Sequence, residues 1–243
     1  MTETQSWKKY VAEMLGTFTL VFLGCAAILS GAGYVGIALA FGLALTIGIV
    51  AFGPLSGGHF NPAVTIAMWL NKKTSTQDVV PYVVCQIIGA TIAAGVLYAM
   101  WAVGGTASTT AMTAIGGTAT NWTGITATGA LLGEIFLTAL FVVAIFAAVS
   151  RPNLQAYAPL VIGLALAGIH FAAMGLTGAS VNPARSLGPA LFNANNVLTA
   201  EFAMAYVVGP VVGGLLGAFV WRFASEEQPT AWVAPKRAME VRA

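Results

Sequence analysis

Long apolar runs separated by short polar segments dominate this chain. Six of the runs are long enough to form membrane-spanning helices, because about 20 apolar residues cross a bilayer. The runs are continuous and rich in Gly and Ala, which favours closely packed helices over the strict alternation of a membrane β-barrel. They lie at about residues 10–30, 35–53, 80–101, 128–149, 156–174 and 199–223. The pattern therefore predicts an all-α membrane protein.

The charged residues are few and unevenly distributed. Only 7% of the 243 residues are Asp, Glu, Lys or Arg, whereas soluble domains contain about 25%. The segments 14–71, 79–133 and 152–184 contain no such residue. A soluble protein could not cover its surface with so few charges. The composition therefore excludes a cytosolic enzyme, a nucleic-acid-binding protein and a disordered chain.

The basic residues fall on one side of an arrangement with six spans, and Arg185 is the exception. They precede the first span, separate the second span from the third and the fourth from the fifth, and end or follow the sixth. These residues are Lys8, Lys9, Lys72, Lys73, Arg151, Arg222, Lys236, Arg237 and Arg242. Basic loops remain in the cytoplasm. We therefore expect an integral protein of the plasma (cell inner) membrane with both termini in the cytoplasm.

The segments outside the spans indicate little chemistry. The uncharged connection 102–127 is rich in Thr, Gly and Ala, and we expect it to be an ordered outer loop. Asn121 begins a glycosylation sequon there, a triplet that is common by chance. Cys25 and Cys85 lie in apolar runs, which predicts buried thiols and neither a disulfide nor a metal site. We expect no cofactor, no metal ion and a mobile cytoplasmic tail over 224–243.

Two polar segments recur at a spacing of 121 residues. The sequence SGGHFNPAVT occupies 56–65 and TGASVNPARS occupies 177–186. Glu13 and Glu134 are separated by the same interval, and each begins a Glu-x-x-x-Thr pattern. The chain therefore resembles a duplication, with repeats at about 8–101 and 128–223 in a single channel domain covering 1–243. Because each half contains three spans, the second half must insert upside down relative to the first, which is an inverted repeat.

Each Asn-Pro-Ala triplet predicts the start of a short helix. Asn is a favoured N-cap and Pro is favoured at the first helical position. A helix of about ten residues is roughly 15 Å long, half of a bilayer core. Two half-helices entering from opposite faces would therefore meet with their N-termini at the midplane. The triplets are Asn61-Pro62-Ala63 and Asn182-Pro183-Ala184.

The residues before the triplets predict non-helical backbone at the same depth. Gly57, Gly58 and Gly178 suit crowded, irregular conformations. Such backbone is tolerated within a membrane only where it is buried in protein or lines a watery cavity. The predicted fold is therefore six transmembrane helices plus two re-entrant half-helices around an aqueous pathway.

These paired motifs and the two glutamates closely resemble the aquaporin (major intrinsic protein) family, water-selective type, over about residues 8–223. The resemblance implies a right-handed bundle in a lipid bilayer, assembled as a homotetramer with one pore in each subunit and water as the permeant. It implies that Asn61 and Asn182 donate hydrogen bonds to passing water and that His59 lies beside the pore. It also implies an outer selectivity constriction formed by Phe41, His170, Ala179 and Arg185.

A mechanism follows from these parts. The half-helix N-termini place positive potential near the midplane, and Arg185 adds a full charge at the outer constriction. Backbone carbonyls of Gly57–His59 and Gly178–Ser180 are expected to accept hydrogen bonds along one wall. Glu13 and Glu134 are expected to support the non-helical backbone, not to relay protons. The prediction is a passive water channel that excludes protons and ions and is not an enzyme.

Selectivity leaves alternatives open. Ser186 and Ala190 stand where glycerol-conducting relatives tend to have Asp and a basic residue, and His170 narrows the pore, so we expect glycerol to be excluded. Ala179 is smaller than the Thr or Cys of relatives, and Val207 stands where water channels often have Trp. One alternative is therefore a broader facilitator for ammonia, hydrogen peroxide or glycerol. A secondary transporter, which also uses inverted repeats, is a less favoured alternative.

Overall fold

The computed structural model describes residues 3–103, 124–192 and 198–225, and its regular structure over these residues is entirely helical. The sequon at Asn121, most of the predicted outer connection and the tail beyond Ser225 lie outside the described residues. Predictions for those segments remain predictions.

Six helical segments are long and apolar enough to cross a membrane within the described ranges, as predicted. Several of them extend a few residues beyond the apolar runs. Helix ends of this kind suit the polar interfacial layers of a bilayer, which is about 40–45 Å thick in all. The sixth segment contains one π-helical stretch, and a short 3₁₀ turn, η1, precedes the fifth. The segments are α1 (Glu3–Leu29), α2 (Gly33–Ser56), α4 (Thr76–Val103), α6 (Ala127–Ser150), η1 (Gln155–Tyr157) with α7 (Ala158–Thr177), and α9 (Ala200–Ala203) with η2 (Met204–Val208) and α10 (Gly209–Ala224).

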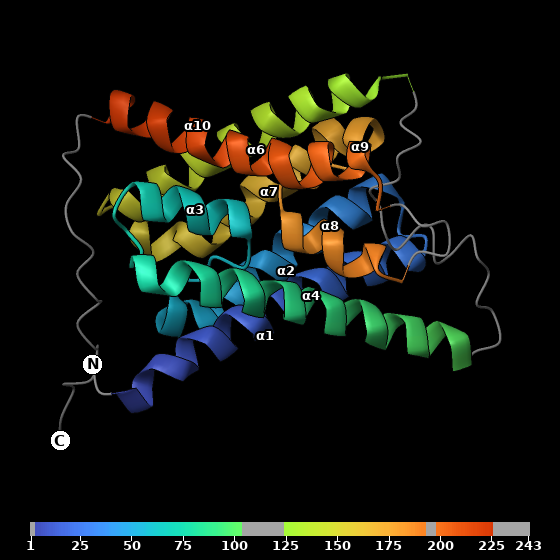
Figure 1. The fold of residues 1–243 in the computed structure, drawn as a ribbon, viewed down its shortest axis with the longest axis horizontal. Coiled ribbons are helices and arrows are strands. Elements are labelled where there is room, and N and C mark those ends of the chain that lie inside the picture. The colour runs from blue at the N-terminus through green and yellow to red at the C-terminus, as the bar shows by residue number, and fades with distance from the viewer. Residues whose placement is uncertain (1–2, 104–123, 193–197, 226–243) are drawn as a thin grey trace.

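Two short helices lie inside the bundle formed by the six segments. They are α3 (Pro62–Leu70) and α8 (Pro183–Ala190), each beginning with the proline of an Asn-Pro-Ala triplet. Figure 1 shows that they extend from the middle of the bundle toward opposite ends. The predicted half-helices are therefore present, slightly shorter than ten residues. The first turn of α1 and the last turn of α10 lie at the same end of the bundle, which we call the inner end (Figure 1).

The helices pack as two related halves. In the first half α1 lies against α2 and α4, and in the second α6 lies against α7 and α10. The halves join where α2 crosses α7 at Gly42 and Gly163. A Cβ atom on either glycine would lie 2.5 Å from the carbonyl oxygen of the other. Only glycine allows this approach, and the two positions are related by the 121-residue spacing.

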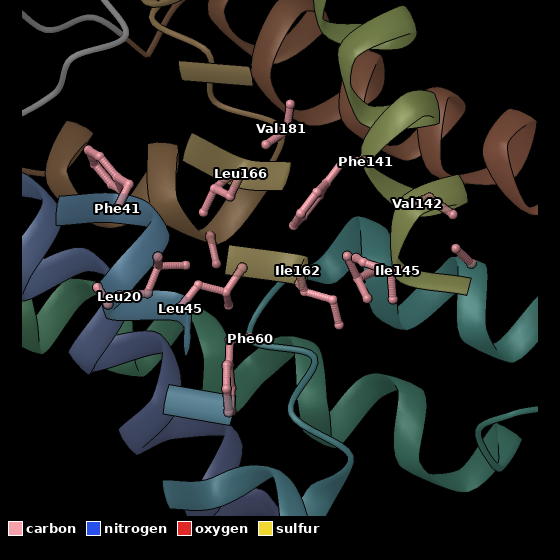
Figure 2. Packing of buried hydrophobic residues seen from close by; sticks show 14 of the residues in the cluster. Leu20, Phe41, Leu45, Phe60, Phe141, Val142, Ile145, Ile162, Leu166 and Val181 are labelled. Atoms are coloured by element: carbon pink, nitrogen blue, oxygen red, sulfur yellow. The ribbon is translucent and has the colours of Figure 1, made fainter. Parts of the chain in front are cut away.

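The buried apolar side chains converge on the centre of the bundle. Figure 2 shows Leu20, Leu45, Phe141 and Leu166 directed toward one region between the helices. Large apolar side chains are also exposed on the outside, for example Leu140 and Phe223 at 66% and 85%. An apolar exterior of this kind suits a lipid environment and not water. The protein is an integral membrane protein built around a packed centre.

Candidate pore

Two asparagines cap the facing half-helices and link the two loops to each other. The side-chain oxygens of Asn61 and Asn182 each accept a hydrogen bond from the backbone N–H two residues on, at 2.9 and 3.0 Å. Asn61 Nδ2 donates to the Val181 carbonyl at 2.7 Å, and Asn182 Nδ2 donates to the Phe60 carbonyl at 2.9 Å. A side-chain amide carries two N–H donors. The second donor of each asparagine has no acceptor among the described residues, and both asparagines line one cavity.

Glu13 holds the loop that precedes α3. One carboxyl oxygen accepts hydrogen bonds from Ser56 Oγ at 2.6 Å and from the His59 N–H at 3.0 Å. The other oxygen accepts from the Phe60 N–H and from Gln86 Nε2, both at 2.7 Å. The glutamate is fully buried. It therefore satisfies backbone donors that the surrounding helices do not.

Glu134 has the same role in the second half. It accepts hydrogen bonds from Thr177 Oγ1 at 2.6 Å, from the Ser180 N–H at 3.0 Å and from the Val181 N–H at 2.7 Å. These three donors follow Ser56, His59 and Phe60 by 121 residues, while Gln86 has no counterpart among the donors to Glu134. Both carboxyl groups are occupied by loop donors, so the geometry supports the structural role predicted for them.

In both loops the backbone N–H groups have hydrogen-bond acceptors, whereas several backbone carbonyl oxygens have no donor within the described residues. In each half, three successive N–H groups donate to a helix carbonyl, to a hydroxyl and to the glutamate. No described residue donates a hydrogen bond to the carbonyl oxygens of residues 57–59 or 178–180. Polar backbone groups inside a membrane protein need partners. These carbonyls can therefore accept hydrogen bonds from groups other than the described residues.

The loops contain backbone conformations that the sequence did not indicate. Phe60, Ala179 and Val181 have φ of 50°, 49° and 46°. This left-handed region costs non-glycine residues about 1–3 kcal/mol each. Phe60 and Val181 carry the carbonyls that accept the asparagine bonds. The asparagine hydrogen bonds and the glutamates therefore stabilise a strained backbone in both loops.

Three of the four predicted constriction residues lie together. The rings of Phe41 and His170 stack with centroids 4.5 Å apart and planes 21° apart. The guanidinium carbon of Arg185 lies 4.7 Å from the Phe41 centroid. All three are buried and line the same cavity as the two asparagines. Ala179 is also buried, but its side chain is not part of that lining.

The single hydrogen bond of His170 determines which ring nitrogen is left without a partner. Nδ1 lies 3.0 Å from the Leu166 carbonyl, which can only accept, so Nδ1 carries the proton. Nε2 has no partner among the described residues, although the side chain is only 1% exposed. A neutral ring in this tautomer presents Nε2 as an acceptor beside the cavity. A solute that donates a hydrogen bond suits this position.

The cavity has one polar and one apolar side. Its volume is about 10 Å³, close to the minimum that holds one water molecule. His59 and Ser180, at equivalent positions of the two loops, line it with the asparagines. His59 Nδ1 lies 3.1 Å from Thr65 Oγ1, and the Ser180 hydroxyl bonds with that of Ser186. The opposing side is formed by Leu20, Leu45, Phe141 and Leu166 (Figure 2).

The remaining predicted residues are not among those that line this cavity. Gly57, Gly58 and Gly178 lie in irregular backbone, as predicted, with φ of 95°, 68° and 82°. Pro62, Ala63, Pro183 and Ala184 form the first turns of α3 and α8 and are buried.

Sequence reasoning missed two tyrosines that fix the loops. Tyr82 donates a hydrogen bond to the Ser56 carbonyl, and Tyr206 donates one to the Thr177 carbonyl, both at 2.7 Å. The two tyrosines are 124 residues apart. Gly89 and Gly213 are separated by the same interval, and they face the backbone of Met14 on α1 and of Ile135 on α6, respectively. The longer connection after α8 shifts the repeat by three residues. A search at 121 alone could not find this pair.

Comparison with known proteins agrees with this geometry. The family model described as "Major intrinsic protein" matches residues 1–221. The chain belongs to this family, whose members are membrane channels for water and small solutes.

Individual relatives differ in their named solutes. The chain is 40% identical over 230 residues to "Aquaporin Z" of Photorhabdus laumondii, covering 91% of this chain and 99% of that protein. It is 41% identical over 222 residues to "Glycerol uptake facilitator protein-like 6" of Lactiplantibacillus plantarum, covering 90% and 99%. The structure of the aquaglyceroporin from Plasmodium falciparum matches with a TM-score of 0.76 at 24% identity, covering 90% of this chain and 96% of that one. This last likeness supports the fold alone.

Proposed function

We propose that this protein is a passive channel that conducts water in single file and excludes protons and ions. The proposal depends mainly on hydrogen-bonding groups of the two loops that have no partner in the described part of the protein, in a chain that spans a membrane. Six loop carbonyls and one N–H of each motif asparagine lack partners among the described residues. Water can bond to both kinds of group, while the apolar side of the cavity lets it move on. The relative named "Aquaporin Z" supports the same conclusion.

Exclusion of charge follows from the same geometry. The N-termini of α3 and α8 point at the midplane, and each contributes about half a positive charge. A water that accepts hydrogen bonds from Asn61 and Asn182 is poorly oriented to accept another from a neighbouring water. Proton transfer along the file is therefore interrupted at that point. Arg185 repels cations further out.

Selectivity among neutral solutes depends in this proposal on the outer constriction of Phe41, His170, Ala179 and Arg185. The rings of Phe41 and His170 and the Arg185 guanidinium lie close together, which supports a narrow polar constriction that favours water over glycerol. The second candidate is a broader facilitator for ammonia, hydrogen peroxide or glycerol. The small side chain at Ala179 and the relative named a glycerol uptake facilitator favour that candidate.

Assembly and orientation complete the proposal. We expect a homotetramer in the inner membrane, with residues 1–243 forming one channel domain per subunit and both termini in the cytoplasm. The inner end of the bundle carries the described basic residues other than Arg185, which supports this orientation. A secondary transporter would need an ionisable coupling site near the midplane. The buried glutamates are instead occupied by loop donors.

The two solute classes can be separated in one experiment. Purified protein in liposomes is mixed rapidly with an impermeant sucrose gradient and, separately, with glycerol and urea gradients. Water permeability above that of empty vesicles with glycerol permeability equal to theirs supports a water channel. High glycerol permeability supports the broader facilitator. Solute uptake that requires a proton gradient would support a transporter and refute both.

A further inference from the structure

An ion pair joins α1 to α4 at the inner end of the bundle. Lys9 Nζ lies 2.7 and 2.8 Å from the two carboxyl oxygens of Asp78, and the Tyr10 hydroxyl donates to one of them at 2.9 Å. The Lys9 and Asp78 side chains are only 17% and 13% exposed. This pair is therefore less screened by solvent than the surface pairs that contribute little.

Aromatic contacts connect this ion pair to the pore. The rings of Tyr10 and Tyr82 meet edge to face with centroids 6.0 Å apart, and those of Tyr82 and His59 meet similarly at 5.3 Å. Tyr82 also bonds to the Ser56 carbonyl at the start of the first loop. His59 lines the cavity. We call Lys9, Tyr10, Asp78 and Tyr82 the inner cluster.

The second half of the molecule achieves the equivalent packing without charge. The residue equivalent to Lys9 is Ala130, and the residue equivalent to Asp78, with the three-residue shift, is Phe202. Ala130, Phe202 and Tyr206 pack together in one apolar cluster, and Tyr206 still bonds to its loop. The fold therefore does not need an ion pair at this place. Buried ion pairs are often no more stabilising than apolar packing, so stability alone does not account for it.

We propose that the Lys9–Asp78 pair, with Tyr10, positions the inner mouth of the pore. This inference rests on the proposed water conduction. The pair joins the second turn of α1 to the first turn of α4. Tyr10 and Tyr82 then keep the His59 ring against the side of the cavity. When the pair is broken, Tyr82 keeps its bond to Ser56, and the His59 ring keeps only its contacts with Thr65 Oγ1 and Thr74 Oγ1, at 3.1 and 3.4 Å. The imidazole is then less constrained and can move toward the water path. The residues act through His59 and do not touch the permeant.

The test compares water permeability per channel in liposomes with counted protein. Asp78→Asn and Lys9→Gln should each lower permeability at least threefold and raise its activation energy. The exchanged variant Lys9→Asp/Asp78→Lys should restore permeability to within twofold of the wild type. Lys8→Gln is the matched control, because Lys8 is exposed and the charge change is the same. It should conduct like the wild type.

Two changes at Tyr82 separate positioning from folding. Tyr82→Phe keeps both ring contacts and loses only the hydrogen bond to the Ser56 carbonyl, so it should lose less permeability than Tyr82→Leu. Tyr82→Leu removes the ring contacts as well and should lose permeability as Asp78→Asn does. Melting temperatures and oligomeric state are recorded for every variant. The inference is overturned if Asp78→Asn or Tyr82→Leu conducts like the wild type, or if the exchange restores nothing. A wild type that conducts no water above empty vesicles would instead refute the proposed function, and this inference with it.

Discussion

Replacing Glu134 by glutamine tests how the second loop is held. Glu134 accepts two hydrogen bonds at one oxygen, from Thr177 and Ser180, and one at the other, from the Val181 N–H. In the Glu134→Gln variant, most bonds are kept when the amide oxygen accepts from Thr177 and Ser180. The new NH₂ group then points toward the Val181 N–H. Two donors then face each other, so one bond is lost and a buried N–H has no acceptor.

The magnitude follows from that single unsatisfied group. A buried donor without a partner costs about 1–3 kcal/mol. For a chain of this size 1 kcal/mol lowers the melting temperature by about 2–4 °C, so the expected decrease is about 2–12 °C. Because the Val181 carbonyl accepts the Asn61 bond, the displaced loop should also lower water permeability per channel several-fold.

The assay is thermal unfolding of the purified protein in detergent, followed by stopped-flow light scattering of proteoliposomes. Glu201→Gln is the matched control, since Glu201 is exposed and the chemical change is identical. It should melt and conduct like the wild type. Equal melting temperatures and permeabilities for Glu134→Gln and the wild type would refute the account of Glu134 as the acceptor for this loop.

Further predictions concern the constriction, the helix crossing and the thiols. His170→Gly should raise glycerol permeability several-fold while keeping water permeability, and unchanged glycerol exclusion would show that His170 does not set the opening. Gly163→Ala should destabilise the protein by about 1–3 kcal/mol or more, because the new Cβ would collide with the α2 backbone. Gly168, on the same helix, faces open space, so the Gly168→Ala variant should have the melting temperature of the wild type. Mercury should inhibit the wild type weakly, because Ala179 stands where relatives often have Cys or Thr. Strong inhibition that disappears in Cys25→Ser would contradict that prediction.

The topology was predictable because it depends on features that a sequence states directly. Hydropathy predicted six spans, and the 121-residue interval between Glu13 and Glu134 predicted two inverted halves. The capping preferences of Asn and Pro predicted where α3 and α8 begin. Each of these signals is local, or repeats at a fixed distance, so no packing information was needed.

The parts that were not predictable depend on packing between distant segments. The positive φ of Phe60 and Val181 has no local signal, because the strain is offset by hydrogen bonds from residues far away in the sequence. Tyr82 and Tyr206 escaped notice because the repeat shifts by three residues after α8. The Lys9–Asp78 pair connects two helices whose facing surfaces hydropathy cannot identify.

The central claim is that the open donors and acceptors of the two loops carry water and no charge. The most direct test measures osmotic water permeability and proton flux on the same proteoliposomes. The account predicts rapid shrinkage in sucrose, several-fold faster than that of empty vesicles, with no added proton flux under a pH gradient. Shrinkage at the rate of empty vesicles, or rapid proton entry that accompanies the water, would contradict it.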